Sequence, residues 1–111
     1  MLEKDMEEKL KKRVKELGGI CVKLNCAGTS GMPDRLILLP HGTVALVELK
    51  TDKGVLTTLQ EYTIEKINGL DILADVVQGE TRLDIFINTL EMEMWRNEDL
   101  RNTEMSDAND F

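Results

Sequence analysis

Two carboxylates and a lysine near the middle of the chain have the types and spacing that metal-dependent hydrolysis needs. Asp34 precedes a short apolar segment, and Glu48 and Lys50 end the next one. If residues 40–42 form the loop of a hairpin, Asp34 faces Glu48 on the neighbouring strand. Facing side chains have Cβ atoms roughly 4.5–5.5 Å apart, and every second residue shares a face, so Lys50 lies beside Glu48. This register predicts one patch made of Asp34, Glu48 and Lys50.

Two facing carboxylates repel each other, so the predicted pair needs either a cation or exposure to water. Oxygen ligands of this kind suit a hard divalent ion such as Mg²⁺ or Mn²⁺. The pattern is typical of metal-dependent nucleases, which makes the chain a candidate phosphodiesterase.

Two simpler readings of the same residues stay open. A hairpin loop of even length would turn Asp34 to the other face, and Asp34 after Pro33 fits an ordinary turn, with Glu48 and Lys50 as a solvated strand end. Against the second reading, residues 44–47 are apolar in both alternating phases, which predicts a central strand buried on both faces.

The remaining pattern predicts an α/β domain with the element order α-β-β-β-α-β and a central mixed sheet flanked by helices. A first helix carries an apolar stripe, stops at Gly18-Gly19 and has Glu3 and Glu7 beside that stripe. The predicted ranges are 20–24 for the first strand, 57–68 for the second helix, 71–77 for the last strand and 81–95 for a last helix. In the second helix, Thr57 and Gln60 fit a capping box, in which each side chain binds the other residue's backbone N–H.

Composition fits one globular domain over residues 1–95, followed by an acidic tail at 96–111 that we expect to be disordered. The net charge of −7 disfavours DNA as a partner, but residues 91–111 contribute −5 of it. A basic run in the first helix is a candidate phosphate-contacting strip, or else a solvated face with Glu-to-Lys pairs: Lys9, Lys11, Lys12, Arg13 and Lys15. No apolar run is long enough to span a membrane, and we expect a cytoplasmic protein.

Cysteine and histidine contribute little to a candidate site. Cys21 and Cys26 lack Cys-x-x-Cys spacing, and a disulfide is not expected in a reducing compartment. His41 is the single histidine, so neither a zinc cluster nor a histidine-based triad is available, and we expect it to be a loop residue.

Three consecutive motifs resemble the signatures of the VRR-NUC family, a branch of the PD-(D/E)xK nuclease superfamily. They are Gly31-Met32-Pro33-Asp34-Arg35, Val47-Glu48-Leu49-Lys50 and Leu56-Thr57-Thr58-Leu59-Gln60. The likeness covers roughly residues 1–78, and chains of this size resemble the stand-alone phage and bacterial members. The resemblance implies a restriction-endonuclease-like core, Mg²⁺ or Mn²⁺ as cofactor, and cleavage of branched double-stranded DNA, including four-way (Holliday) junctions, by a homodimer.

The resemblance also implies roles for individual residues. Asp34 and Glu48 would bind the metal, helped by the Leu49 carbonyl, and Lys50 would stabilise the transition state. A first-helix glutamate would complete the cluster, with Glu7 preferred and Glu3 as its competitor, and Gln60 would lie beside the centre. The expected DNA contacts are Arg35, Lys11, Lys12 and Lys53, although Arg35 could instead pair with a carboxylate. A flap or duplex nuclease of the same fold, or a non-catalytic DNA-binding module, is the alternative.

Overall fold

The structure is a computed structural model that describes residues 1–25 and 31–109, with side chains described as far as residue 104. Its order is α1 (Glu3–Glu16), β1 (Ile20–Lys23), β2 (Arg35–Leu39), β3 (Thr43–Lys50), α2 (Thr58–Asn68), β4 (Leu73–Gln78) and α3 (Gly79–Asn109). This is the predicted α/β order followed by a long last helix. Cys26 lies outside the described residues, and Cys21 is a free thiol.

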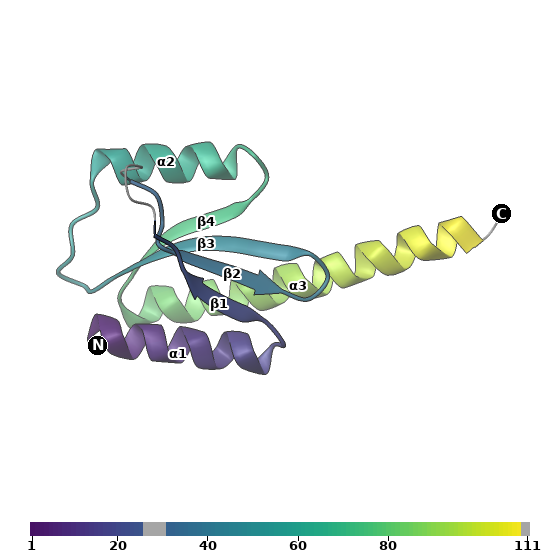
Figure 1. Cartoon of the computed structure of the whole chain (residues 1–111), viewed down its shortest axis with the longest axis horizontal. Helices are drawn as coiled ribbons and strands as arrows, with labels where there is room; N and C mark the ends of the chain where they lie inside the picture. The colour runs from purple at the N-terminus through teal and green to yellow at the C-terminus, as the bar shows by residue number, and fades with distance from the viewer. Residues whose placement is uncertain (26–30, 110–111) are drawn as a thin grey trace.

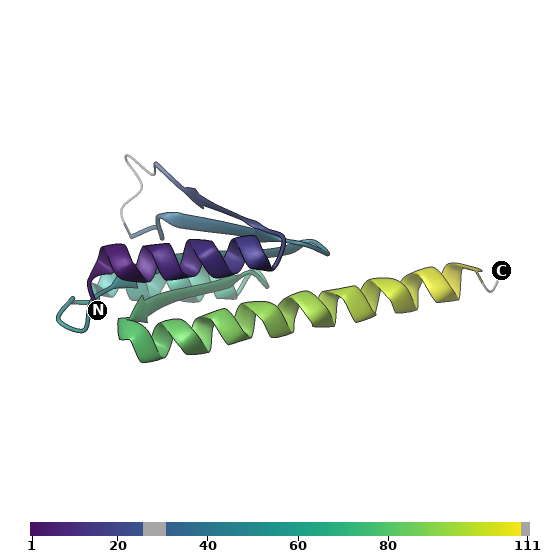
Figure 2. The ribbon, with the colours of Figure 1, turned by 90° about the horizontal axis from the view of Figure 1, so that it is seen from below.

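The four strands form one mixed sheet in the order β1-β2-β3-β4. β1 and β2 are antiparallel, as are β2 and β3, whereas β3 and β4 are parallel and are joined through α2. Figure 1 shows α2 on one side of the sheet and α1 and α3 on the other, and Figure 2 shows α1 and α3 side by side. The chain therefore forms three layers, with the two larger helices sharing one face.

The main core lies between the sheet and the α1–α3 layer. α1 contributes Met6, Leu10 and Val14, spaced so that they point the same way, and all are buried. α3 contributes Leu83, Phe86, Ile87, Leu90 and Met94, and the sheet contributes Ile37, Leu39, Ala45, Val47, Leu49 and Val77. Burying these apolar side chains stabilises the fold by about 25 cal/mol per Å² removed from water.

β3 is an inner strand, as predicted, but only one of its faces is fully buried. Thr43, Ala45, Val47 and Leu49 are buried, whereas the residues between them are exposed or half-buried. The reason is that α2 packs mainly against β4 and leaves the β1–β2 side of its layer open. The prediction of burial on both faces was therefore wrong, and Glu48 and Lys50 lie on the less buried face.

The last helix runs to Asn109, well past the predicted end near Trp95. Contacts with the β2–β3 hairpin hold its middle part: Asn97 donates a 2.8 Å hydrogen bond to Thr43, and Glu98 lies 4.0 Å from His41. His41 lies in the hairpin loop, as expected, with a positive φ of 64°. Of the apolar side chains near this point, Met94 is buried and Met92 and Trp95 are exposed. Within the part of the chain that the structure describes, no helix has the length and hydrophobicity to cross a bilayer.

Candidate active site

The hairpin register brings Asp34 next to Glu48. Every pair in the β2–β3 ladder follows the predicted register, from Leu39 opposite Thr43 to Arg35 opposite Val47, and Asp34 and Glu48 are the next residues outward. The backbone of Asp34 is fixed to the end of β1, because its carbonyl accepts a 2.6 Å hydrogen bond from the Leu24 N–H. The three-residue loop thus sets the register on which the site depends.

The Glu48 and Asp34 side chains interact through their charges and through a hydrogen bond. Burial and the negative charge of Asp34, together with a hydrogen bond between the two side chains, raise the pKa of Glu48 to about 7. A carboxyl group with such a pKa is held in an environment that disfavours its charge, as at many metal and catalytic sites. A bound cation would remove this penalty, and it would lower the pKa again.

Lys50 lies on the same face of β3 as Glu48, and its positive charge lowers the pKa of Glu48 against the other contributions. The turn after β3 folds back onto this lysine: a Cβ built on Gly54 would lie 3.0 Å from the Lys50 Cβ. Gln78, at the end of β4, donates a hydrogen bond to the Gly54 carbonyl and anchors the turn. The strand end that carries Lys50 is therefore supported from two sides.

The two candidate glutamates on α1 have different surroundings. Both carboxylate oxygens of Glu7 are engaged, Oε1 by Lys11 Nζ at 2.8 Å and Oε2 by Arg35 Nη2 at 2.7 Å. The hydrogen bond from Lys11, with a further contribution from Arg35, lowers the pKa of Glu7. Glu3 is exposed, and its charge contributes to the raised pKa of Glu48.

Arg35 is buried and points into the core layer. Only 6% of its side chain is exposed, and its Nε lies 3.9 Å from Asp34 Oδ1 while Nη2 holds Glu7. Of the two roles expected for Arg35, pairing with a carboxylate is therefore the one that the structure shows. A guanidinium group that is 6% exposed presents little surface to DNA. The sequence contains a signal for this burial, because every second residue of a strand lies on the same face. Arg35 shares its face with Ile37 and Leu39, which are buried in the core.

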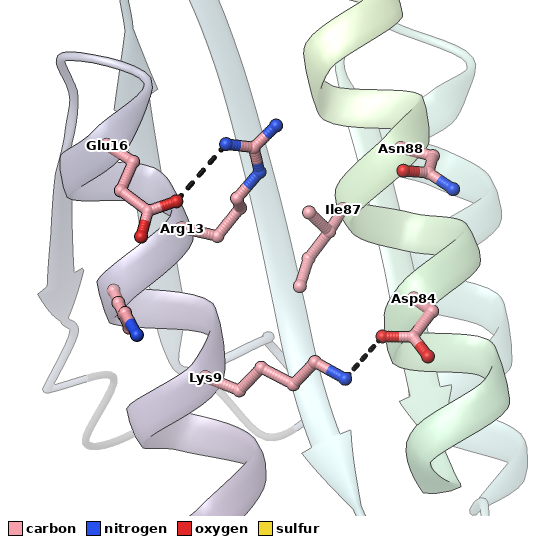
Figure 3. A pocket seen from close by; sticks show the side chains of 7 residues that line it. Lys9, Arg13, Glu16, Asp84, Ile87 and Asn88 are labelled. Carbon is pink, nitrogen blue, oxygen red and sulfur yellow. Dashed lines mark hydrogen bonds and ion pairs between the residues drawn. The ribbon is translucent and has the colours of Figure 1, made fainter.

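Most of the basic run on α1 is already paired with carboxylates. Lys9 and Arg13 line a groove of about 430 Å³, and Lys9 Nζ lies 2.6 Å from Asp84 Oδ1. Figure 3 shows these side chains between α1 and α3. Arg13 pairs with Glu16 at 3.2 Å and with Glu91 at 2.8 Å. Within the described residues, Lys12 forms no ion pair, and it lies exposed at the edge of this groove. The run as a whole is therefore a poor phosphate-binding strip.

The other expected site residues lie on the elements that follow β3. Gln60 completes the predicted capping box, since its Oε1 accepts from the Thr57 N–H and its own N–H donates to Thr57 Oγ1, both at 3.1 Å. Lys53 is exposed in the turn after β3, and the Leu49 side chain is buried, which leaves only its backbone carbonyl as a possible ligand. The cap is confirmed; a role for Gln60 in the site stays a prediction.

The oxygen ligands that the site offers suit a hard cation that also binds substrate. Across the described residues, no group of three or more His, Cys, Asp or Glu side chains is arranged to hold a metal. The site instead offers two adjoining carboxylates, Asp34 and Glu48, whose mutual repulsion a cation would relieve. Mg²⁺ is commonly held by one or two carboxylates, with water and substrate phosphate completing its shell. The residues present therefore suit Mg²⁺ or Mn²⁺ better than a closed structural metal centre.

An α/β domain with paired carboxylates and a lysine at the end of an inner strand has the architecture of the PD-(D/E)xK class. No family model matches the sequence. A solved structure described as a VRR_NUC domain is 30% identical and superposes with a TM-score of 0.69, covering 78% of this chain and 94% of that domain. The chain belongs to the VRR-NUC family.

A second relative comes from a phage. It is named "Putative nuclease p44", from Acyrthosiphon pisum secondary endosymbiont phage 1, and is 42% identical over 48 residues. The match spans 43% of this chain and about half (52%) of that protein.

Proposed function

We propose that this protein is a metal-dependent DNA endonuclease that hydrolyses phosphodiester bonds. The observation that carries the proposal is the Asp34–Glu48 pair, in which burial and mutual repulsion raise the pKa of Glu48 to about 7 beside Lys50. Membership of the VRR-NUC family and the phage relative named as a nuclease support it. A domain that only bound DNA would gain nothing from clustered acids facing a polyanion.

Asp34, Glu48 and the Leu49 carbonyl would hold Mg²⁺ or Mn²⁺. When bound, the ion would polarise the phosphoryl oxygen and lower the pKa of a water molecule. The two carboxylates keep this position fixed relative to the β2–β3 hairpin, and their negative charge selects a cation over other ligands. The half-buried setting of Glu48 strengthens that selection, because electrostatic interactions are screened less away from bulk water.

Lys50 is the residue to which we assign transition-state stabilisation. Its ammonium group lies on the face of Glu48, where it can approach the extra negative charge that develops on phosphorus oxygens during in-line attack. Gln60 lies in the first turn of α2, and we assign it the orientation of a water molecule or a phosphate oxygen. Its side-chain amide nitrogen can serve this role while its carbonyl remains in the cap.

DNA contact would come from exposed lysines on α1 and in the turn after β3. Lys12 and Lys53 are exposed, and Lys11 can share its charge between Glu7 and a phosphate. Three such contacts, in a chain of net charge −7, would give modest affinity with a shallow salt dependence, because each neutralised phosphate adds to the salt slope. Selectivity would then depend on the shape of the DNA more than on its sequence.

We propose four-way junctions as the substrate and a homodimer as the active form, both on the basis of the family. Two symmetric cuts on opposing strands need two centres related by a two-fold axis, and each chain supplies one. The exposed Met92 and Trp95 side chains on α3 are available for subunit contact. A flap or duplex nuclease with the same centre is the second candidate.

A cleavage panel tests this proposal. Labelled four-way junction, flap and linear duplex are incubated with the protein in Mg²⁺, Mn²⁺ or chelator, beside a Lys50→Ala control. Paired, metal-dependent nicks confined to the junction would support a resolving nuclease. Cleavage of flap or duplex DNA would support the nuclease assignment but refute the four-way junction as the substrate. Binding without any cleavage would contradict the assignment as an enzyme.

A further inference from the structure

The buried arginine beside the site connects two elements that the chain brings together only on folding. Arg35 begins β2, directly after Asp34, and its guanidinium reaches Glu7 on α1. The Arg35–Glu7 contact is short, 2.7 Å, and the arginine side chain is 6% exposed. Arginine suits this position because its planar group donates in several fixed directions at once and stays charged when buried.

Both carboxylate oxygens of Glu7 already have cationic partners, and across the described residues Glu7 does not join Asp34 and Glu48 in a group of three acids placed to hold a metal. Lys11 holds one of its oxygens and Arg35 the other, at 2.8 and 2.7 Å. Moving Glu7 toward an ion at Asp34 and Glu48 would draw it away from Arg35, and a buried guanidinium that loses its nearest partner is unfavourable. The lowered pKa of Glu7 agrees with a carboxylate already matched by cations.

We infer that Glu7 and Arg35 form a positioning pair for Asp34, so that Glu7 supports the candidate metal site through Arg35 and does not bind the ion itself. Arg35 Nε faces Asp34 Oδ1 at 3.9 Å, while its other end is held on α1. The pair therefore limits where the Asp34 carboxylate can lie relative to Glu48. This revises the expected role of Glu7 and gives Arg35 a role other than DNA contact.

The inference rests on the proposed function for its metal, so its test begins with metal binding and without DNA. Mn²⁺ affinity is measured by calorimetry for the wild type, Glu7→Gln, Arg35→Lys and the double variant. Arg35→Lys keeps the buried charge, so the protein retains its fold more readily than with a neutral residue. Glu8→Gln is the matched control, because Glu8 lies on the same helix but is exposed.

The expected result is non-additive. Each single variant should weaken Mn²⁺ binding roughly 10–100-fold, the usual effect of removing a residue that orients a ligand. The double variant should be within about threefold of the weaker single variant, since both changes break the same connection. Glu8→Gln should bind Mn²⁺ like the wild type. If the affinity loss of the double variant equalled the product of the two single losses, Glu7 would bind the ion independently of Arg35, and the inference would be overturned.

DNA affinity measured in chelator is a second test, because it would change if Arg35 contacted a DNA phosphate. Arg35→Gln, which removes the charge, and Arg35→Lys, which keeps it as a check on folding, should both bind labelled junction within about twofold of the wild type with the same salt dependence, while kcat in Mn²⁺ falls. A weaker complex with a reduced salt slope would make Arg35 a DNA contact and refute the positioning role.

The outcomes separate this inference from the function on which it rests. Wild-type Mn²⁺ binding that is unchanged in Glu7→Gln and Arg35→Lys refutes the positioning pair and leaves the nuclease proposal intact. Failure of the wild type to bind Mn²⁺ refutes both, because no metal site then exists to be positioned.

Discussion

Replacing Glu48 by glutamine should stabilise the metal-free protein at alkaline pH while removing its metal site. The pKa of Glu48, raised from its ordinary 4.5 to about 7, corresponds to at most about 3.4 kcal/mol at 1.36 kcal/mol per pKa unit. Burial is the largest cause and the charge of Asp34 the next. Glutamine removes the repulsion but still buries a polar group, and solvent screens a half-buried pair, so we expect a gain of about 1–2 kcal/mol.

The sign of the pH dependence follows from proton binding. Between pH 4.5 and about 7 the folded wild type holds a proton on Glu48 that the unfolded chain has released. Below pH 4.5 the Glu48 carboxyl is protonated in both states and does not lower the free energy of unfolding. The free energy of unfolding falls as the pH rises from 4.5 through about 7, where the folded protein loses this proton. The advantage of Glu48→Gln should be near zero at pH 4.5 and reach its full value by pH 8.5.

Urea unfolding in chelator at pH 4.5, 6 and 8.5 measures this difference, with Glu8→Gln as a control at an exposed position. Comparing each variant with the wild type at the same pH cancels the other titrating groups, including Asp75, whose pKa is also raised by burial. Saturating Mn²⁺ should stabilise the wild type and leave Glu48→Gln unchanged. A variant that is less stable than the wild type at pH 8.5, or a difference that does not vary with pH, would refute the reasoning.

Three further substitutions give distinct expectations. Lys50→Ala should lower kcat roughly 10²–10³-fold with DNA affinity within about threefold, measured by single-turnover cleavage and by binding in chelator; a comparable loss in affinity would contradict its assignment to the transition state. Thr57→Ala should cost about 1 kcal/mol in urea unfolding, because it removes the cap of α2, and an unchanged midpoint would argue against that cap. Gly79→Ala should destabilise by about 1–3 kcal/mol, since φ is +82° and a Cβ would collide with Asp52, whereas Gly69→Ala, at φ −65° with only ordinary 3.4 Å contacts for a Cβ, should be neutral.

The hairpin and the helix cap could be predicted because both depend on local chemistry. A three-residue loop between two apolar runs fixes the register, so the pairing of Asp34 with Glu48 follows from counting along the chain. The capping box likewise needs only Thr57 and Gln60 three residues apart. For the same reason, the order of helices and strands up to β4 was confirmed by the structure.

The ion pairs around the site could not be predicted, because they join residues distant in the chain. Glu7 and Arg35 meet only after α1 packs on the sheet; the period of two places Arg35 on the core face, but it does not identify Glu7 as its partner. The length of α3 depends in the same way on the hairpin, whose Thr43 binds Asn97. The acidic composition of this segment favours disorder by itself, but charged residues such as Glu93 and Arg96 also form pairs along a helix.

The most direct test of the account is the rate of cleavage of a labelled four-way junction in Mn²⁺ by the wild type and by Glu48→Gln, at protein concentrations that saturate the DNA. The account predicts cleavage by the wild type that chelator abolishes, and none above background by the variant despite equal DNA binding. Cleavage by Glu48→Gln at the wild-type rate, or cleavage by the wild type in chelator, would contradict it.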